Sequence, residues 1–206
     1  MIQANERRIG LMGGTFNPIH LGHLIIAEFA RHRFGLEKVI FIPAKEPPHK
    51  EHEKLLQAEH RCEMVRLAVE SNPYFEVSRE ELDRQGLSYS VDTVKKFYEL
   101  FGSGTQLYFI LGADAMLEIT TWKNVDKVMK LCYFAAATRP GYTLAEMRRQ
   151  IEGLPPSFQG RIFTFEIPRI DISSTDIRHY IKNGEPIKYL VPECVEKYIE
   201  RHKLYR

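Results

Sequence analysis

The sequence has few cysteines and no long apolar run, and both shortages exclude classes of protein. Its three cysteines, Cys62, Cys132 and Cys194, are an odd number without metal-ligand spacing, so we expect reduced thiols and neither a disulfide framework nor a zinc site. The longest apolar run, residues 131–137, has seven residues, whereas a membrane-spanning helix needs about 20. The first residues also lack the apolar core of a secretion signal. These features predict a cytoplasmic protein with no membrane segment.

The sequence also lacks an excess of charge of either sign. Its 29 basic and 27 acidic residues leave a net charge of +2, too small a bias for binding a nucleic-acid duplex through counterion release. Hydrophobic residues make up 44% and charged residues 27%, close to the average for soluble globular proteins. We therefore expect one folded domain over residues 1–206, a local anion site and no nucleic-acid partner. The sequence leaves the oligomeric state open, a homo-oligomer included.

Short apolar runs alternate with amphipathic stretches along the chain. Strands that are apolar on both faces and separated by helices indicate a parallel sheet covered on both sides. We therefore predict a doubly wound, Rossmann-like α/β fold with helices on both faces. The expected strands are residues 9–12, 39–42, 75–77, 107–111, 133–137 and 162–167. The expected helices begin near residue 20, include residues 64–68 and 91–101, run from about 173 to 184, and follow residue 192.

Residues 44–59 are the least core-like stretch, because they contain two prolines and many charges. We interpret them as a mobile flap over a site and not as a linker between domains. In doubly wound sheets, ligands bind outside the carboxyl ends of the strands, where the strand order reverses. The loops that follow strands are therefore the expected place for binding residues.

The first such loop reads GGTFNPIHLGH over residues 13–23. Its two glycines allow a close approach of backbone and ligand, and the free amides of the following helix start favour a phosphate. His20 and His23 are three residues apart and so project from one side of the first turn, with Gly22 adding no side chain between them. The loop matches neither a Walker loop nor a dinucleotide fingerprint. The alternative, two chance histidines on an ordinary helix, is disfavoured by the preceding glycine pair.

A second loop precedes the helix expected from about residue 173. Ser173 and Asp176 have the spacing of a capping box, with Asp in place of the usual Glu. Amides, hydroxyls and the guanidinium of Arg178 would then gather at one helix end, which suits a polyphosphate. Taken alone, this motif is explained better by an ordinary capped surface helix.

Together the two loops resemble the nucleotidyltransferase superfamily that has the class I aminoacyl-tRNA-synthetase-like fold. Residues 13–23 are similar to its H-x-G-H signature, and residues 174–178 (STDIR) match its S-T-x-x-R-like motif. The resemblance implies that ATP is a substrate and that His20, His23 and Arg178 are the catalytic residues, all three on its phosphates. The other ATP-binding residues that it implies are Gly13, Gly14, Thr15, Phe16, Gly22, Gly112, Asp114 (on the ribose), Ile172, Ser174 and Thr175.

Three further segments resemble bacterial nicotinate mononucleotide adenylyltransferases, and this resemblance covers nearly the whole chain. The segments are residues 47–50 (PPHK), 88–93 (SYSVDT), and 111–114 (LGAD) followed by a Trp-Lys pair. The resemblance implies that nicotinate mononucleotide is the second substrate. Its pyridine ring would stack on Trp122, and its carboxylate would bind the amides of Val91 and Lys123. The remaining acceptor-binding residues that it implies are His49, Ser90, and Lys50 and Arg139 as phosphate clamps.

The implied reaction is attack of the mononucleotide phosphate on the α-phosphorus of ATP. The nucleophile is already an anion, so no general base is needed, and Mg²⁺ would be carried mainly by the ATP phosphates with no protein ligand. Two alternatives stay open. One is a transferase with another phosphorylated acceptor, such as phosphopantetheine or glycerol phosphate, although those families lack the tryptophan and PPHK segments. The other is a non-catalytic nucleotide sensor. The sequence does not decide between nicotinate and nicotinamide mononucleotide.

Overall fold

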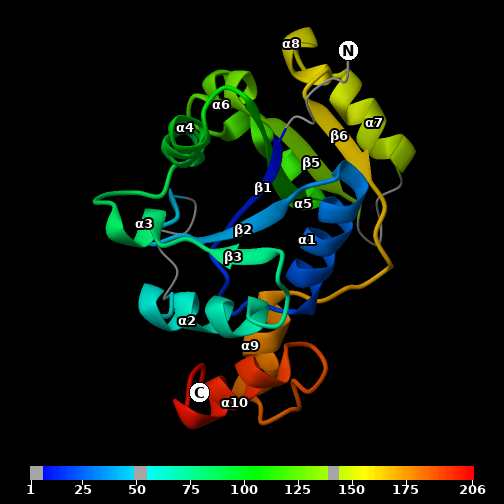
Figure 1. Cartoon of the computed structure of the whole chain (residues 1–206). Coiled ribbons are helices and arrows are strands. Elements are labelled where there is room, and N and C mark those ends of the chain that lie inside the picture. Colours follow the sequence, from blue (N-terminus) through cyan, green and yellow to red (C-terminus); the bar gives the residue numbers. More distant parts are fainter. Residues whose placement is uncertain (1–6, 49–54, 139–143) are drawn as a thin grey trace.

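A six-stranded parallel sheet forms the centre of the computed structural model, which describes residues 7–48, 55–138 and 144–206 (Figure 1). The strand order is β3-β2-β1-β4-β5-β6, and every neighbouring pair is parallel. The order therefore reverses between β1 and β4, which confirms the predicted doubly wound fold. The strands are β1 (Arg7–Gly14), β2 (Lys38–Pro43), β3 (Phe75–Val77), β4 (Thr105–Gly112), β5 (Tyr133–Ala137) and β6 (Ile162–Phe165).

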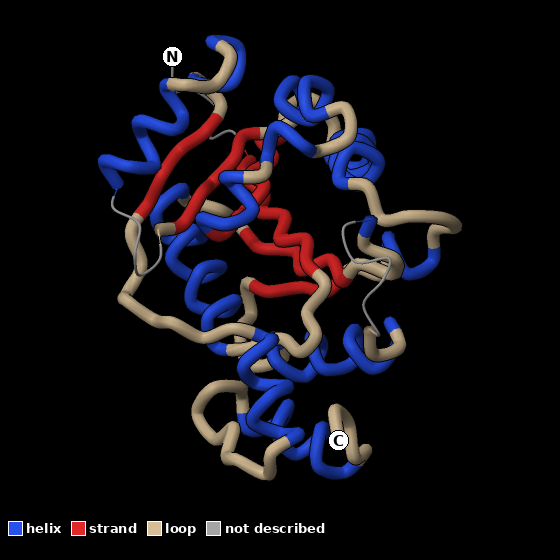
Figure 2. The backbone as a smooth tube through the Cα atoms, turned by 180° about the vertical axis from the view of Figure 1, so that it is seen from behind, coloured by secondary structure: helices blue, strands red, loops and turns tan. Residues whose placement is uncertain are grey.

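Alternate residues of the central strands β1, β2, β4 and β5 enter two hydrophobic cores, one on each face of the sheet. In β1, Met12 packs into one core, whereas Ile9 and Leu11 pack into the other. Figure 2 shows the strands between the two helical layers. The first face is covered by α1 (Leu21–Phe34), α2 (Ala58–Val69), α9 (Ser174–Lys182) and α10 (Glu193–Arg201). The second is covered by α4 (Ser90–Phe101), α5 (Ala113–Leu117), α6 (Val125–Leu131), α7 (Leu144–Glu152) and α8 (Pro156–Gln159).

Two expectations about single elements were wrong. The strand expected over residues 162–167 ends at Phe165, because β6 pairs only with β5 and that strand ends at Ala137. The apolar spacing in α1 included Phe29, yet this side chain is 43% exposed. The fully buried positions of α1 are instead the small residues Gly22, Ala27 and Ala30, which let the helix lie close to the sheet.

The stretch interpreted as a flap is only partly described. Residues 49–54 lie outside the described ranges, and the last two residues of the stretch belong to α2. Two short elements follow later in the chain, α3 (Glu80–Asp83) and a 3-10 helix η2 (Ile119–Thr121). No helix in the described part of the chain is both long enough and apolar enough to cross a membrane.

Candidate active site

Two cavities open at the carboxyl ends of β1 and β4, where the strand order reverses. The first, which we call the histidine cavity, has a volume of about 350 Å³ and is lined by His20 and His23. The second, the tryptophan cavity, has a volume of about 290 Å³ and is lined by Trp122. Both cavities are lined by Gly13, Leu111 and Ala115, so they meet there.

The glycines of the first loop are required by close packing. A Cβ atom on Gly14 would lie 2.9 Å from the ring of Phe16, and one on Gly13 would lie 3.1 Å from the ring of Phe109. Phe16 itself has a φ of +47°, a left-handed conformation that is uncommon for a residue with a side chain. Such backbone strain persists only where the surroundings hold it, and it is frequent at functional sites.

The two histidines lie together at the start of α1, as predicted. Their ring centres are 3.8 Å apart, and the backbone amide of His20 donates to Nδ1 of His23 at 3.2 Å. Because Nδ1 of His23 accepts this bond, the proton of its neutral imidazole is on Nε2, which is left as a donor. A Cβ atom on Gly22 would lie 3.0 Å from the His20 ring, so a larger residue would press against that ring.

Both imidazoles are neutral at pH 7, because burial disfavours the charged form. Burial lowers the pKa of His20 to about 4. The pKa of His23 is lowered well below its ordinary value, first by burial and then by the neighbouring charge of His20. Each histidine can therefore donate one hydrogen bond to a phosphate, and an anion close to the pair would raise both pKa values again.

The helix start offers fewer free amides than the sequence predicted. The Leu21 amide donates to the Leu190 carbonyl at 3.0 Å, and the His23 amide donates to the His20 carbonyl at 3.0 Å. The expectation of several unpaired amides was therefore wrong, since two of them are already bonded. The Gly22 amide lies between them, and the bonds described for this turn do not use it.

The second loop lies directly against the first. Ser174 Oγ donates to the Pro18 carbonyl at 2.8 Å, and Arg178 donates to the Asn17 carbonyl at 2.9 Å. Ser173 caps α9 by accepting from the Asp176 amide at 3.1 Å, which confirms the predicted cap. The Asp176 carboxylate accepts from the Ser173 hydroxyl, a variation on the reciprocal bond of a capping box. The two sequence motifs are therefore adjacent in space.

Arg178 is placed differently from the histidines. Its guanidinium donates to Asn17 and, at 3.3 Å, to Thr175 Oγ1, and it is not among the residues that line the histidine cavity. Ile172, Ser173 and Ser174 line that cavity from the second loop. A guanidinium has five N–H donors, so these two bonds leave donors for an anion.

Trp122 is half-buried beside the tryptophan cavity. Its ring contacts Phe109 edge-on, with centres 5.5 Å apart, and also contacts Phe134. The Nζ atom of Lys123 lies 3.8 Å from the ring centre of Tyr89, and both residues line the cavity. An indole face and a nearby ammonium suit an aromatic ring that carries negative charge.

A buried carboxyl group that the sequence did not reveal also lines this cavity. Glu81 is 6% exposed and accepts from Thr93 Oγ1 at 2.6 Å. Burial raises the pKa of Glu81, and hydrogen bonds from Thr93 and Ser88 oppose this rise. The Ser88 hydroxyl in turn accepts from the amides of Lys45 and Glu46. This network joins α3 and α4 to the chain that follows β2.

Two further polar residues that sequence analysis missed hold the first loop. Arg61 of α2 is fully buried and donates to the Thr15 carbonyl at 2.6 Å. Tyr205, next to the last residue, donates to Asn17 Oδ1 at 2.9 Å, and burial raises the pKa of this phenol. No local pattern identifies either residue, because an arginine within an amphipathic helix and a tyrosine near a chain end are usually exposed.

The predicted site residues divide into five groups. The histidine cavity is lined by Gly13, His20, Gly22, His23, Gly112, Ile172 and Ser174, and the tryptophan cavity by Gly13, Gly14, Thr15, Ser90, Trp122 and Lys123. Phe16 and Val91 are buried, and Thr175 and Arg178 lie beside the second loop, outside both linings. His49, Lys50, Arg139 and the side chain of Asp114 lie outside the described residues.

Comparisons with known proteins agree on one family. Residues 11–180 match the family model described as cytidylyltransferase-like. A Moorella thermoacetica protein named "probable nicotinate-nucleotide adenylyltransferase" is 55% identical over 97% of this chain and 92% of its own length. A Desulfitobacterium hafniense protein of the same name is 50% identical over 100% and 99%. The solved Plasmodium falciparum nicotinic acid mononucleotide adenylyltransferase complexed with NaAD has the same fold, with a TM-score of 0.79, 19% identity and 97% coverage of both chains.

Proposed function

Because the chain belongs to the nicotinate-nucleotide adenylyltransferases, we propose that the junction of its two cavities is where ATP and nicotinate mononucleotide react. The reaction transfers the adenylyl group of ATP to nicotinate mononucleotide and yields nicotinate adenine dinucleotide and pyrophosphate, a step of NAD biosynthesis. We place the reaction there because the two cavities share the lining residues Gly13, Leu111 and Ala115. Two substrates in adjoining cavities can bring their phosphates together at that point.

ATP occupies the histidine cavity in this proposal. The apolar wall of this cavity, which includes Ile25, Ile26 and Ile170, suits the flat adenine base, and the two histidines line the same cavity from the start of α1. His20 and His23 donate N–H groups to the phosphates of ATP, and the Gly22 amide adds a third donor. Arg178, with donors left after its bonds to Asn17 and Thr175, binds the outer phosphates and the departing pyrophosphate.

Nicotinate mononucleotide occupies the tryptophan cavity. The pyridine ring stacks on Trp122, and the carboxylate lies near the start of α4 and near Lys123. The first amides of a helix have no acceptor within the helix and favour an anion, which supports the predicted role of the Val91 amide. Lys50 and Arg139 as phosphate clamps, and Asp114 as a ribose ligand, rest on the sequence resemblance alone.

Catalysis follows from position and charge. An oxygen of the mononucleotide phosphate attacks the α-phosphorus of ATP, and the bond to the bridging oxygen of the β-phosphate breaks as pyrophosphate leaves. The nucleophile is already ionised, so no residue has to remove a proton from it. His20, His23 and Arg178 stabilise the negative charge that accumulates on the equatorial oxygens and on the leaving group. ATP enters as its Mg²⁺ complex, which is the substrate form.

An acceptor panel tests this function. The protein is incubated with Mg-ATP and, separately, with nicotinate mononucleotide, nicotinamide mononucleotide, phosphopantetheine or glycerol phosphate, and pyrophosphate release is recorded. We expect release with nicotinate mononucleotide, together with formation of the dinucleotide. Release only with phosphopantetheine or glycerol phosphate would indicate a different transferase. Binding of ATP without release with any acceptor would indicate a nucleotide sensor.

A further inference from the structure

Arg61 forms an unusual set of contacts behind the tryptophan cavity. Its guanidinium donates to three backbone carbonyls, those of Thr15 at 2.6 Å, Leu56 at 2.9 Å and Lys45 at 3.1 Å. The side chain is fully buried, and within the described part of the chain it forms no ion pair. Burial lowers the pKa of Arg61 below its ordinary value. Burying a cation is costly, and the three carbonyls offset part of its lost hydration.

The three carbonyls belong to separate segments. Thr15 follows β1, Lys45 follows β2, and Leu56 precedes α2 on the far side of residues 49–54. A guanidinium can hold all three because its donors point outward in one plane, whereas the ammonium of lysine is a compact point charge. Arg61 therefore fixes the loops after two neighbouring strands relative to each other.

These same two loops form one wall of the tryptophan cavity. Gly14 and Thr15 line the cavity from the first loop, and Ala44, Pro47 and Pro48 line it from the loop after β2. A backbone bond from the Ala44 amide to the Gly14 carbonyl, 2.8 Å long, already joins the two loops at the sheet. Beyond that bond, Arg61 connects them through Thr15 and Lys45.

The contact with Thr15 also sets the direction of a peptide group. In a trans peptide, the carbonyl of one residue and the amide of the next point in opposite directions. Because Arg61 holds the Thr15 carbonyl, the Phe16 amide faces away from the guanidinium. Phe16 has a left-handed backbone, and the contact of Arg61 with the preceding carbonyl helps to hold it.

We propose that Arg61 is a positioning residue that holds this wall of the tryptophan cavity in the shape that binds nicotinate mononucleotide. The inference rests on the proposed function and assigns Arg61 no contact with either substrate. The histidine cavity shares Gly13 with this wall, but neither Thr15 nor the loop after β2 lines it; its lining comes chiefly from α1, the end of β4 and residues 167–174. Loss of the guanidinium should therefore weaken acceptor binding much more than ATP binding.

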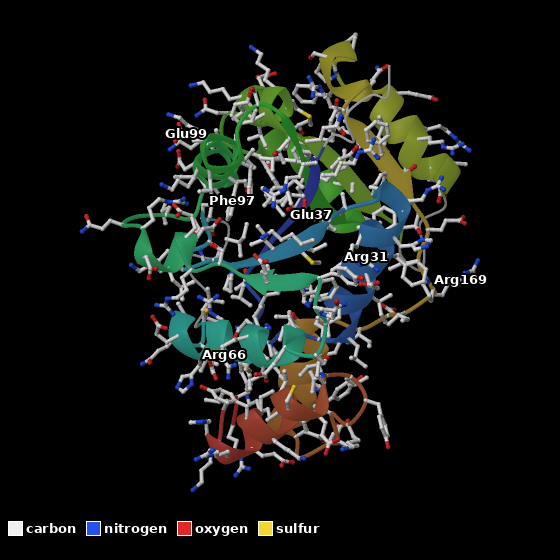
Figure 3. The ribbon with its side chains drawn as sticks, viewed as in Figure 1. Arg31, Glu37, Arg66, Phe97, Glu99 and Arg169 are labelled. Carbon is white, nitrogen blue, oxygen red and sulfur yellow. The ribbon has the colours of Figure 1, made fainter. Side chains whose placement is uncertain are left out.

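The test compares Arg61→Lys and Arg61→Met with a control on the same helix, Arg66→Met. Arg66 lies on α2, where Figure 3 labels it, and is exposed. It pairs with Glu63 and Glu70. Trp122 is the single tryptophan of the chain and lines the cavity, so its fluorescence reports acceptor binding without turnover. The dissociation constant of nicotinate mononucleotide is measured by this fluorescence, and KM for both substrates and kcat by pyrophosphate release.

We expect both Arg61 variants to raise the dissociation constant and KM of nicotinate mononucleotide by about tenfold or more, with the KM of ATP changed by less than about threefold. The Arg66→Met variant should behave as the wild type. Equal changes in both KM values, or unchanged acceptor binding in folded Arg61→Lys, would overturn the proposal. If Arg61→Met does not fold, Arg61→Lys decides, since it keeps the charge and the aliphatic stem. A wild type that neither binds nor turns over nicotinate mononucleotide would contradict the proposed function instead.

Discussion

His20 and His23 show how one short sequence produces a donor pair without positive charge. The His20 amide fixes the tautomer of His23, and burial keeps both rings neutral at pH 7. A neutral imidazole donates a hydrogen bond without carrying a charge of its own before the substrate arrives. The phosphates of ATP then stabilise the charged form in place, so charge develops on the histidines where it is needed.

The His23→Ala variant removes one of these donors. We expect kcat to fall by ~10²–10³ with a modest loss of ATP binding, the size typical of one lost donor to a transition-state charge. The measurement is pyrophosphate release at saturating substrates. His32→Ala is the matched control, because His32 is exposed in the last turn of the same helix. A near-wild-type kcat for His23→Ala would contradict the role assigned to His23.

The lowered pKa of His20 predicts a loss of stability in acid. The unfolded chain takes up a proton on His20 near pH 6.5, but the folded chain does so only near pH 4. The unfolded state therefore binds more protons in this window, and the free energy of unfolding should fall by up to about 3 kcal/mol as the pH drops from 6.5 to 4. Urea denaturation across this range measures it. His20→Asn should show a smaller fall than the wild type, and an equal fall would contradict the assignment.

Trp122→Ala should mainly weaken acceptor binding. Stacking on an aromatic side chain is worth about 1–3 kcal/mol per base, so we expect affinity for nicotinate mononucleotide to fall by about tenfold or more. ATP affinity should stay within about twofold, because Trp122 does not line the histidine cavity. Calorimetry with each substrate measures both, and Trp122→Phe should recover part of the lost affinity. An unaltered affinity of Trp122→Ala for nicotinate mononucleotide would contradict stacking of the pyridine ring on Trp122.

Among single residues, the sequence predicted those that act together within one helical turn. It missed those whose partners are distant in the chain. His20, Gly22 and His23 were predictable because the helix period places them on one turn. Arg61 and Glu81 were not, because their partners come from segments far away in the chain. The partners of Arg61 among the described residues are backbone carbonyls, which every residue type carries, so no sequence pattern reveals them.

Among the elements, the start of α1 depends most on a single residue. Gly22→Ala would bring a Cβ atom to 3.0 Å from the His20 ring and so displace that ring. We expect kcat to fall by about ten- to hundredfold in a folded protein, because small misplacements at a reacting centre are costly. Gly160→Ala is the control, since a Cβ atom there meets open space and the φ of Gly160 is −77°. Equal kcat values for the two variants would contradict this account of Gly22.

Element boundaries were predictable where the apolar run and the sheet agreed. β3 and β5 have the predicted bounds, which coincide with their apolar runs. β6 is shorter than its apolar run, because an edge strand ends with its one partner. The buried face of α1 was harder to predict, because it consists of glycine and alanine and not of large apolar residues. Hydrophobic periodicity detects such a face poorly.

In the whole molecule, the last part of the chain closes around the first loop. Ser174, Arg178 and Tyr205 hold the backbone or side chains of residues 17 and 18, and α10 packs against α2 beside them (Figure 1). The sequence resemblance predicted that the two motifs act on one substrate, and the structure places them side by side. The sequence resemblance could not predict the contact of Tyr205 with Asn17, because long-range contacts of a chain end follow from tertiary packing alone.

A crystal structure with bound nicotinate adenine dinucleotide tests most directly whether the two cavities form one site. We predict that the nicotinate ring lies on Trp122, that the adenylate lies in the histidine cavity, and that the bridging phosphates pass Gly13 within hydrogen-bond distance of His20 or His23. A dinucleotide confined to one cavity, or bound away from Gly13, would contradict this arrangement.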